Sequence, residues 1–217
     1  MKHFMKHDHI IAREGFPFII ISLILTVLAA FFGLTIVTVI LLCVTTFIVC
    51  FFRNPERHFI DEDGLVICPA DGRVIRIEDI EVNGSMKGQF KKISIFMNVF
   101  NVHVNRAPCG GTIEKIQYHP GKFLSANLDK ASAENERNEV MIRTQDGREI
   151  WVVQIAGLIA RRIVCWVGER DMINKGDRFG LIRFGSRVEV FLPSASRVVV
   201  KIGDKVRAGK TPIGYLS

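Results

Sequence analysis

The longest apolar segment of the chain runs from Phe16 to Phe52 and contains no Asp, Glu, Lys, Arg or His. A continuous helix of that length would measure roughly 55 Å, far more than the hydrocarbon core of about 30 Å. The stretch around Gly33 offers a break between two shorter spans, FPFIIISLILTVLAAFF and LTIVTVILLCVTTFIVCFF. The pattern therefore predicts a hydrophobic helical hairpin within residues 1–52, inserted in a membrane or, alternatively, lying at its interface.

After residue 52 the pattern changes to short β-branched runs separated by Gly and Pro, among them GRVIRIEDIEV, GGTIEKIQY, NEVMIRT and REIWVVQIAGLIA. Turns recur about every ten residues, and this favours a mainly β (α+β) fold built as an antiparallel β-sandwich over residues 53–217. One short helix is expected around Leu124 to Arg137. Similar turns, such as PADGRV and PCGGTI, resemble the paired hairpins of lipoyl and biotinyl carrier domains, although such turns are common in β proteins.

The stretch GLIRFGSRVEVFLP, from Gly180 to Pro193, alternates like a single strand. Ile182, Phe184, Val188, Val190 and Leu192 share one face, and Arg183, Arg187 and Glu189 lie largely on the other. Its centre is Gly185-Ser186. Glycine weakens a strand interior, and a buried serine hydroxyl needs a partner, so this pair is the least expected feature of the alternation.

The net charge of +7 is modest, and the basic residues are dispersed. No nucleic-acid-binding motif is present, so an anionic lipid surface is a better partner for this charge than nucleic acid. The five cysteines are scattered, with neither metal-ligand spacing nor a disulfide framework. Lys and Arg flank both ends of the apolar run, which places both ends in the cytoplasm by the positive-inside tendency.

Histidine is the usual acid-base group near neutral pH, and His103 lies in the alternating segment FNVHVNRAP. Asn101 and Asn105 share its face, so this strand face is either solvated or one wall of a polar site. Asp71 in PADG can be a simple turn residue. The adjacent Arg161 and Arg162 would point to opposite faces of a strand, so that at most one could readily contact a phosphate.

Several segments together resemble the short, membrane-anchored form of bacterial phosphatidylserine decarboxylase. They are FFRNPER, PADGRV, FMNVFNVHVNRAP, LDKASAENERN, GLIARRIV and above all RFGSRVEVFLP, and the resemblance runs from about Phe16 to the C-terminus. It implies that the bond between Gly185 and Ser186 cuts itself and that Ser186 becomes a covalent pyruvoyl group, the enzyme's own cofactor, with no metal. The products would be fragments 1–185 and 186–217, held together as a heterodimer.

The same resemblance implies the reaction. The pyruvoyl ketone would form a Schiff base with the amine of phosphatidylserine, accept the electrons freed when carbon dioxide leaves, and release phosphatidylethanolamine. The membrane anchor of residues 1–52 would hold the decarboxylase domain of residues 53–217 at the cytoplasmic face of the cell membrane, where the lipid substrate lies.

The family pattern also implies roles for individual residues. Asp71 matches an aspartate that assists self-cleavage, and His103 matches a histidine associated with decarboxylation, where it would donate a proton. A second family histidine, two residues before the proline, is replaced here by Arg106. The base for self-cleavage is therefore left open.

A membrane-tethered lipoyl- or biotinyl-like carrier or adaptor domain is the alternative from a different functional class. Its modified residue would be Lys87 in GSMKGQF, where a single Met-Lys pair in a Gly-rich turn is a weak signal. A carrier would remain one heavier chain, whereas the decarboxylase would give two fragments.

Overall fold

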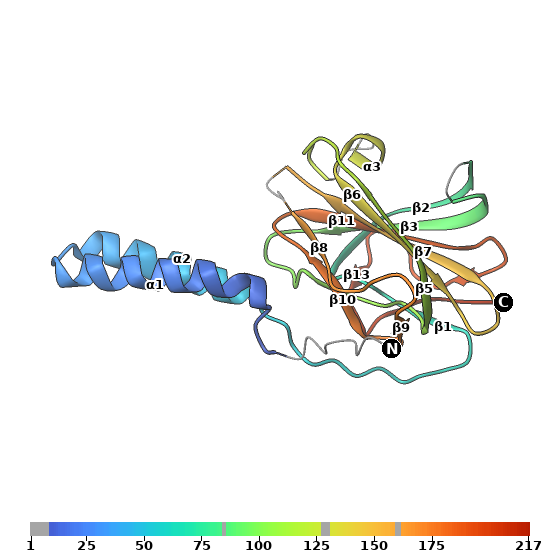
Figure 1. Cartoon of the computed structure of the whole chain (residues 1–217), viewed down its shortest axis with the longest axis horizontal. Coiled ribbons are helices and arrows are strands. Elements are labelled where there is room, and N and C mark those ends of the chain that lie inside the picture. Colours follow the sequence, from blue (N-terminus) through green and yellow to red (C-terminus); the bar gives the residue numbers. More distant parts are fainter. Residues whose placement is uncertain (1–8, 84–85, 127–130, 159–161) are drawn as a thin grey trace. The chain divides into compact units, whose positions relative to one another are not determined.

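The computed structural model describes residues 9–83, 86–126, 131–158 and 162–217. Within them the chain divides into two compact units, His7–Glu56, described from residue 9, and Arg57–Ser217. Arg161, a candidate phosphate contact, lies outside the described residues. The prediction of a mainly β, antiparallel architecture preceded by apolar helices is confirmed (Figure 1).

The first unit is a helical hairpin. A short turn of 3-10 helix, Arg13–Gly15, leads into α1 (Phe16–Phe31), and α2 (Thr35–Phe51) follows after a tight connection. Gly33 has φ +69°, the left-handed conformation that glycine adopts without strain, so the predicted break lies where glycine permits it. Between the two helices, the Ser22 and Thr45 hydroxyls hydrogen-bond at 2.7 Å, and the buried Thr26 hydroxyl lies 3.4 Å from that of Thr45.

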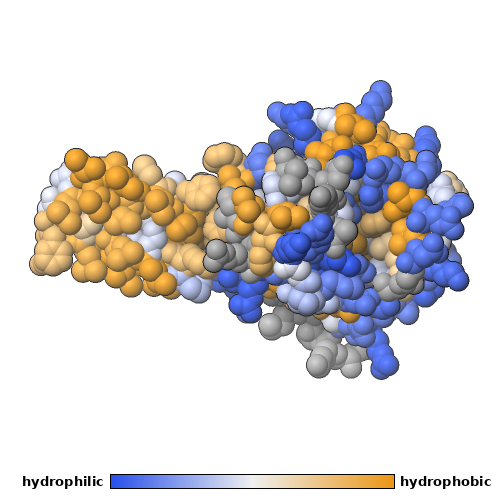
Figure 2. All heavy atoms as spheres, turned by 90° about the horizontal axis from the view of Figure 1, so that it is seen from above, coloured by the Kyte–Doolittle hydropathy of each residue, from blue (hydrophilic) through white to orange (hydrophobic). Residues whose placement is uncertain are grey.

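Most large apolar side chains of the hairpin are exposed, and Figure 2 shows them covering the visible face of both helices. The segment Arg13–Phe31 is long and apolar enough to cross a membrane, while Thr35–Phe51 is a shorter apolar helix. At the open end, Ile11 bridges Arg53 and the Ala12 amide donates to the Phe52 carbonyl at 2.8 Å. The two ends of the hairpin therefore lie side by side.

In the part of the chain that the structure describes, the second unit is built from three antiparallel sheets. Its elements are β1 Leu65–Ile67, β2 Gly72–Val82, β3 Gly88–Met97, β4 Val104–Arg106, β5 Gly111–His119, α3 Ala131–Glu134, β6 Arg137–Arg143, β7 Glu149–Ala156, β8 Ile163–Cys165, β9 Met172–Ile173, β10 Arg178–Ile182, β11 Ser186–Pro193, β12 Arg197–Val198, β13 Lys205–Val206 and β14 Pro212–Tyr215. An eight-stranded sheet has the order β13-β2-β3-β11-β7-β6-β5-β9, and two three-stranded sheets have the orders β4-β10-β8 and β1-β14-β12.

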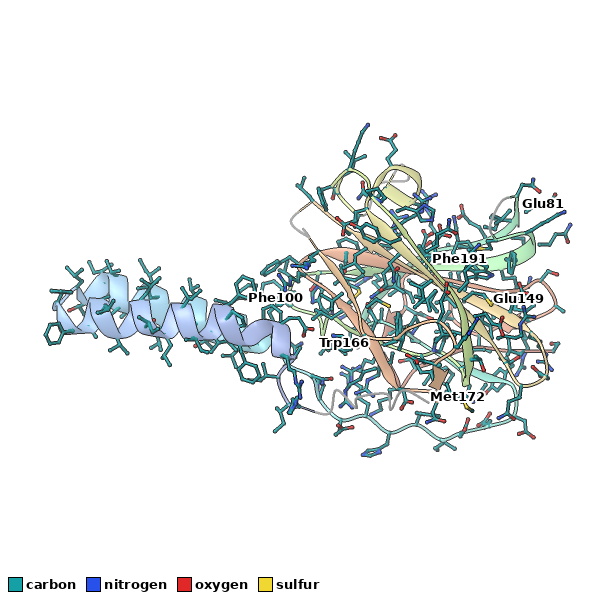
Figure 3. All side chains as sticks on the ribbon, in the orientation of Figure 1. Glu81, Phe100, Glu149, Trp166, Met172 and Phe191 are labelled. Carbon is teal, nitrogen blue, oxygen red and sulfur yellow. The ribbon has the colours of Figure 1, made fainter. Side chains whose placement is uncertain are left out.

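The main core lies on one face of the eight-stranded sheet. Alternate residues of β11, namely Val188, Val190 and Leu192, are fully buried there together with side chains from the small sheets such as Phe179 and Ile213. The other face carries a second apolar cluster that includes Trp151 and Phe191, the latter labelled in Figure 3. Because β11 has a core on each face and a strand on each edge, it lies at the centre of the unit.

Two details differ from the sequence prediction. The stretch from Gly180 to Pro193 is not one strand: β10 and β11 belong to different sheets, and residues 183–185 turn between them. The reason is Phe184, whose φ of +59° ends the extended backbone although its apolar side chain keeps the alternation. The helix expected around Leu124 to Arg137 is also shorter, because α3 covers Ala131–Glu134 and residues 127–130 lie outside the described residues.

Candidate active site

The Gly185-Ser186 pair lies where the chain passes from a turn into β11. Phe184, just before it, holds a positive φ that a bulky residue rarely adopts, and such local strain is concentrated at functional sites. Gly185 is partly exposed, whereas Ser186 is completely buried. The peptide bond between them therefore joins the surface of the unit to its interior.

Ser186 is fixed by strands on both sides. It pairs with Met97 of β3 and with Ala156 of β7. Its hydroxyl points into the core and contacts Met97 Sδ at 3.4 Å. Ser186 therefore lies on the same face of β11 as Val188 and Val190.

Gly157 approaches the Gly185 carbonyl very closely. A Cβ added at Gly157 would lie 2.0 Å from the Gly185 oxygen and 3.1 Å from Ala126 Cβ. No side chain fits at that distance, so a glycine at 157 is what allows the loop after β7 to pack on the carbonyl that Ser186 would attack. The sequence prediction missed this residue, although Gly157 opens the segment GLIARRIV.

The opposite face of β11 carries a buried ion pair. Arg187 and Glu189 approach to 3.2 Å, with side chains 1% and 3% exposed. Arg187 also donates to the Ala126 carbonyl at 2.6 Å, and Ser132 donates to Glu189 at 2.8 Å. These bonds attach the segment around α3 to the strand that begins at Ser186. The alternation placed these two charges opposite the apolar face, and in the structure this side is buried as well, with Ala126 and Ser132 bonded to them.

His103 lies in a buried position between β3 and β4, and only 1% of it is exposed. The hypothesis of a solvated strand face is therefore wrong for His103 and Asn105, which is fully buried as well, while Asn101 is partly exposed. His103 Nδ1 lies 2.9 Å from the Asn101 carbonyl oxygen. A carbonyl only accepts hydrogen bonds, so Nδ1 carries the proton, and in the neutral ring Nε2 is the basic nitrogen.

The backbone of His103 is tied to the strand that leads to the candidate cleavage position, since its carbonyl accepts from the Ile182 amide at 3.3 Å. The exposed Phe100, labelled in Figure 3, lies in the same loop between β3 and β4. The fold therefore brings the His103 loop and the residue-183 turn to the same end of β3 and β11.

Asp71 is 7% exposed and is held by a strong set of partners. Arg57 binds both carboxylate oxygens, the Nη2–Oδ2 distance being 2.8 Å, and the Ala208 amide donates to Oδ1 at 2.8 Å. Through β2 and β3, Asp71 lies about two strand spacings from Ser186, roughly 10 Å. The structure thus places Asp71 near the site but not against the serine.

A cavity of about 480 Å³ lies beside Asp71. Its lining includes Asp71, Asn98 and Asn101, with Lys205 and Arg207 adding positive charge. Asn101 is the residue whose carbonyl holds His103. The cavity therefore links Asp71 to the loop that positions His103, although Ser186 does not line it.

Arg106, at the position of the second family histidine, has a different environment. It is 5% exposed, its Nη1 donates to the Gly176 carbonyl at 2.8 Å, and its Cδ would lie 2.5 Å from a Cβ at Gly209. These contacts bind the guanidinium to the loops at residues 176 and 209. They give Arg106 a role in holding those loops.

The buried cysteines near these residues are poor nucleophiles. Burial raises the pKa of the Cys68 thiol to about 12, and it does the same for the Cys109 thiol. Both remain protonated at neutral pH, where the thiolate would be the reactive form. Among the described residues, no group of three or more His, Cys, Asp or Glu is placed to hold a metal ion.

Sequence reasoning also missed a row of buried amides next to Ser186. Asn105, Gln154 and Asn138 are 0%, 0% and 3% exposed and are hydrogen-bonded to one another. The available signal was Gln154, a polar residue facing the core side in the apolar run IWVVQIA.

Comparison with known proteins identifies the family. The phosphatidylserine decarboxylase family matches residues 44–214. The chain belongs to this family of decarboxylases. A phosphatidylserine decarboxylase proenzyme of Syntrophus aciditrophicus is 56% identical over 211 residues, which cover 97% of this chain and 99% of the relative.

Two further relatives with the same printed name support the assignment to the phosphatidylserine decarboxylase family. The protein of Desulfotalea psychrophila is 50% identical over 95% of this chain and 96% of its own length. That of Magnetococcus marinus is 46% identical over 98% of each chain. The relatives are named proenzymes, a term for a chain that becomes active after processing. Lys87, the residue that would be modified under the alternative carrier hypothesis, is exposed and lies just before β3.

Proposed function

We propose that this chain decarboxylates phosphatidylserine to phosphatidylethanolamine, using a pyruvoyl group that it makes by cutting itself between Gly185 and Ser186. The observation that carries the proposal is the placement of that bond: a strained Phe184 precedes it, and a completely buried serine hydroxyl follows it. A buried carbonyl at residue 186, one residue from the surface, fits a group that must be shielded from bulk water yet reached by a substrate.

The chemistry of the cut uses only atoms of the chain. Ser186 Oγ attacks the Gly185 carbonyl carbon, the peptide nitrogen leaves, and the amide becomes an ester. Loss of the Ser186 α-proton and cleavage of the Cβ–Oγ bond release Gly185 as a carboxylate. Water then replaces the nitrogen of the resulting dehydroalanine, ammonia departs, and a ketone remains at residue 186. That ketone supplies the electron sink on which decarboxylation of an amine substrate depends.

The two products would stay together as a heterodimer. Fragment 186–217 begins with β11, which pairs with β3 from Ser186 to Pro193 and with β7 from Ser186 to Phe191, and both partner strands lie in fragment 1–185. The Arg187 and Glu189 side chains add bonds to Ala126, Ser132 and Ser94. Cutting one peptide bond at the start of β11 removes none of these contacts.

Two further residues receive roles. His103 would donate the proton that replaces carbon dioxide: with Nδ1–H held by the Asn101 carbonyl, Nε2 would first take up a proton and then give it to the carbanion. Asp71, held by Arg57, would assist maturation. Since it lies about two strand spacings from Ser186, it would act through the cavity that it lines together with Asn98 and Asn101.

The helical hairpin would serve as the membrane anchor, with residues 1–52 as anchor and 53–217 as decarboxylase domain. Its apolar surface suits a bilayer, and Lys and Arg residues at both ends favour the cytoplasmic side. Phosphatidylserine is itself a membrane lipid. The anchor would keep the active site at the cytoplasmic face of the cell membrane, next to its substrate.

Substitution of the serine tests the proposal. Ser186→Ala removes the attacking oxygen, so the variant should remain one full-length, inactive chain on a denaturing gel. Ser194→Ala, which changes an exposed serine just after the same strand, should be cut and active like the wild type. Appearance of the two normal fragments in Ser186→Ala would refute the position of the cut.

A further inference from the structure

A chain of buried amide side chains crosses between two sheets beside Ser186. Asn105, on β4, accepts a hydrogen bond from Gln154 Nε2 of β7 at 2.9 Å. Gln154 Oε1 in turn accepts from Asn138 Nδ2 of β6 at 3.1 Å. Burial of an amide without a partner costs about 1–3 kcal/mol, so these three amides stay in the core because they satisfy one another.

The direction of these bonds determines what Asn105 presents to the serine. Because its oxygen accepts from Gln154, its amide nitrogen faces the other way, toward Met97 Sδ at 3.8 Å. Ser186 Oγ lies 3.4 Å from the same sulfur. A sulfur is a weak acceptor, so the Asn105 N–H groups are available to a stronger acceptor that forms at the position of Ser186 Oγ.

Neighbouring residues make room for this arrangement. Gly180 pairs with Asn105 across β10 and β4, and a Cβ at Gly180 would lie 3.1 Å from Gln154 Nε2. Arg106, the next residue in the chain, sends its guanidinium to the Gly176 carbonyl instead. Asn105 is thus the polar side chain of β4 that shares Met97 Sδ as a neighbour with the serine hydroxyl.

We propose that Asn105 Nδ2 donates a hydrogen bond to the Ser186 oxygen as that oxygen leaves in the elimination step of self-cleavage, with Gln154, which binds the Asn105 oxygen, as the positioning residue. The inference rests on the proposed function. In this step the α-proton of residue 186 passes to a neutral imidazole, the chemical class that His103 supplies. The C–H electron pair forms the Cα–Cβ double bond, and the Cβ–Oγ pair stays on oxygen.

The leaving oxygen thereby becomes part of the Gly185 carboxylate and gains negative charge in a dry environment. A preorganised donor at such a point is worth roughly 10²–10³-fold in rate when mutated in other enzymes. The acyl shift before it places new charge on the Gly185 carbonyl oxygen, which faces Gly157 instead. Loss of the Asn105 donor should therefore slow elimination while leaving ester formation intact.

Asn105→Leu tests this in the full-length, membrane-anchored chain. It should mature roughly 10²-fold more slowly than the wild type, and uncut chain should accumulate. Hydroxylamine, which cleaves esters, should cut that accumulated chain at residue 185. Mass spectrometry should then find a small fragment that begins with an unmodified serine and a large one that ends in a hydroxamate.

Asn138→Leu is the matched control. It removes a buried amide from the far end of the same row but leaves Gln154 bonded to Asn105, so it should mature within a few-fold of the wild-type rate. Asn105→Asp keeps the shape of the side chain and removes the donor, so it should be as slow as Asn105→Leu. Thermal unfolding shows whether Asn105→Leu folds. If it does not, the maturation rate of Asn105→Asp decides whether the Asn105 donor is needed.

Three results would overturn the inference: normal maturation of a folded Asn105→Leu or Asn105→Asp, equal slowing of Asn138→Leu, or accumulated chain that hydroxylamine does not cut. Failure of the proposed function looks different, because the wild type itself would then not be cut between Gly185 and Ser186.

Discussion

At the scale of single residues, backbone atoms approach the bond to be cut very closely. Gly157 and the Gly185 carbonyl are so close that a methyl group at 157 must displace one of them. Overpacking of this kind typically costs about 1–3 kcal/mol. Here it would act directly on the reacting carbonyl.

Gly157→Ala should therefore slow maturation, and uncut chain should accumulate on a denaturing gel. The free energy of unfolding should fall by no more than the usual cost of overpacking. Gly168→Ala is a suitable control, since its nearest neighbour would be Asp171 Oδ2 at an ordinary 3.5 Å. Equal maturation rates for the two variants would show that the Gly157 contact does not influence the cut.

His103→Ala should lower turnover of the processed enzyme by roughly 10²-fold or more, the usual contribution of a general acid. The exposed His58→Ala should keep wild-type turnover. Turnover is measured as release of carbon dioxide from phosphatidylserine, normalised to the amount of the 186–217 fragment. Near-normal turnover of cut His103→Ala protein would leave this histidine a structural role only.

At the scale of elements, the hairpin joins its own two ends. Ile11 and Arg53 form a bridge, and the Ala12 amide bonds to the Phe52 carbonyl. In a bilayer these ends must lie on the same side, whether the helices cross it or enter one leaflet.

Reporter fusions after Arg13 and after Arg57 should therefore give the same side, and the flanking basic residues make it the cytoplasmic one. Each reporter should be inserted into the full-length chain, so that the protein is not truncated at the insertion point. Reports from opposite sides would mean that the two helices do not form a hairpin in the membrane.

The elements that sequence predicted are those with a local signal. The hairpin follows from an apolar run with one central glycine, and β2 and β5 follow from alternation with bounding turns. The turn at Phe184 was missed because an apolar residue with positive φ preserves the alternation that suggested one strand.

Burial set by distant residues could not be predicted either. Arg187 and Glu189 read as a polar face because their partners, Ala126 and Ser132, lie more than fifty positions away. For the same reason the sequence left open whether the face of His103 and Asn105 is solvated or one wall of a polar site. Gly185 and Ser186 could be singled out from the sequence because a glycine and a serine are both unfavourable in the apolar alternation around them.

At the scale of the whole molecule, the position of β11 makes a cut chain stable as a pair of fragments. The strand lies between β3 and β7, and side chains on each of its faces are buried. A cut at its first residue therefore frees the backbone at Gly185 without exposing an apolar face. The small fragment would carry the carbonyl group, and the large one would carry the anchor, His103 and Asp71.

The most direct test of this account is the intact mass of the purified wild-type protein after denaturation. Two chains are expected, residues 1–185 with a free carboxyl end and residues 186–217 lighter by one ammonia than a fragment that begins with serine. A mild hydride reductant added with phosphatidylserine should attach substrate mass to the small chain alone. A single active chain of full length, or substrate mass only on the large fragment, would contradict the account.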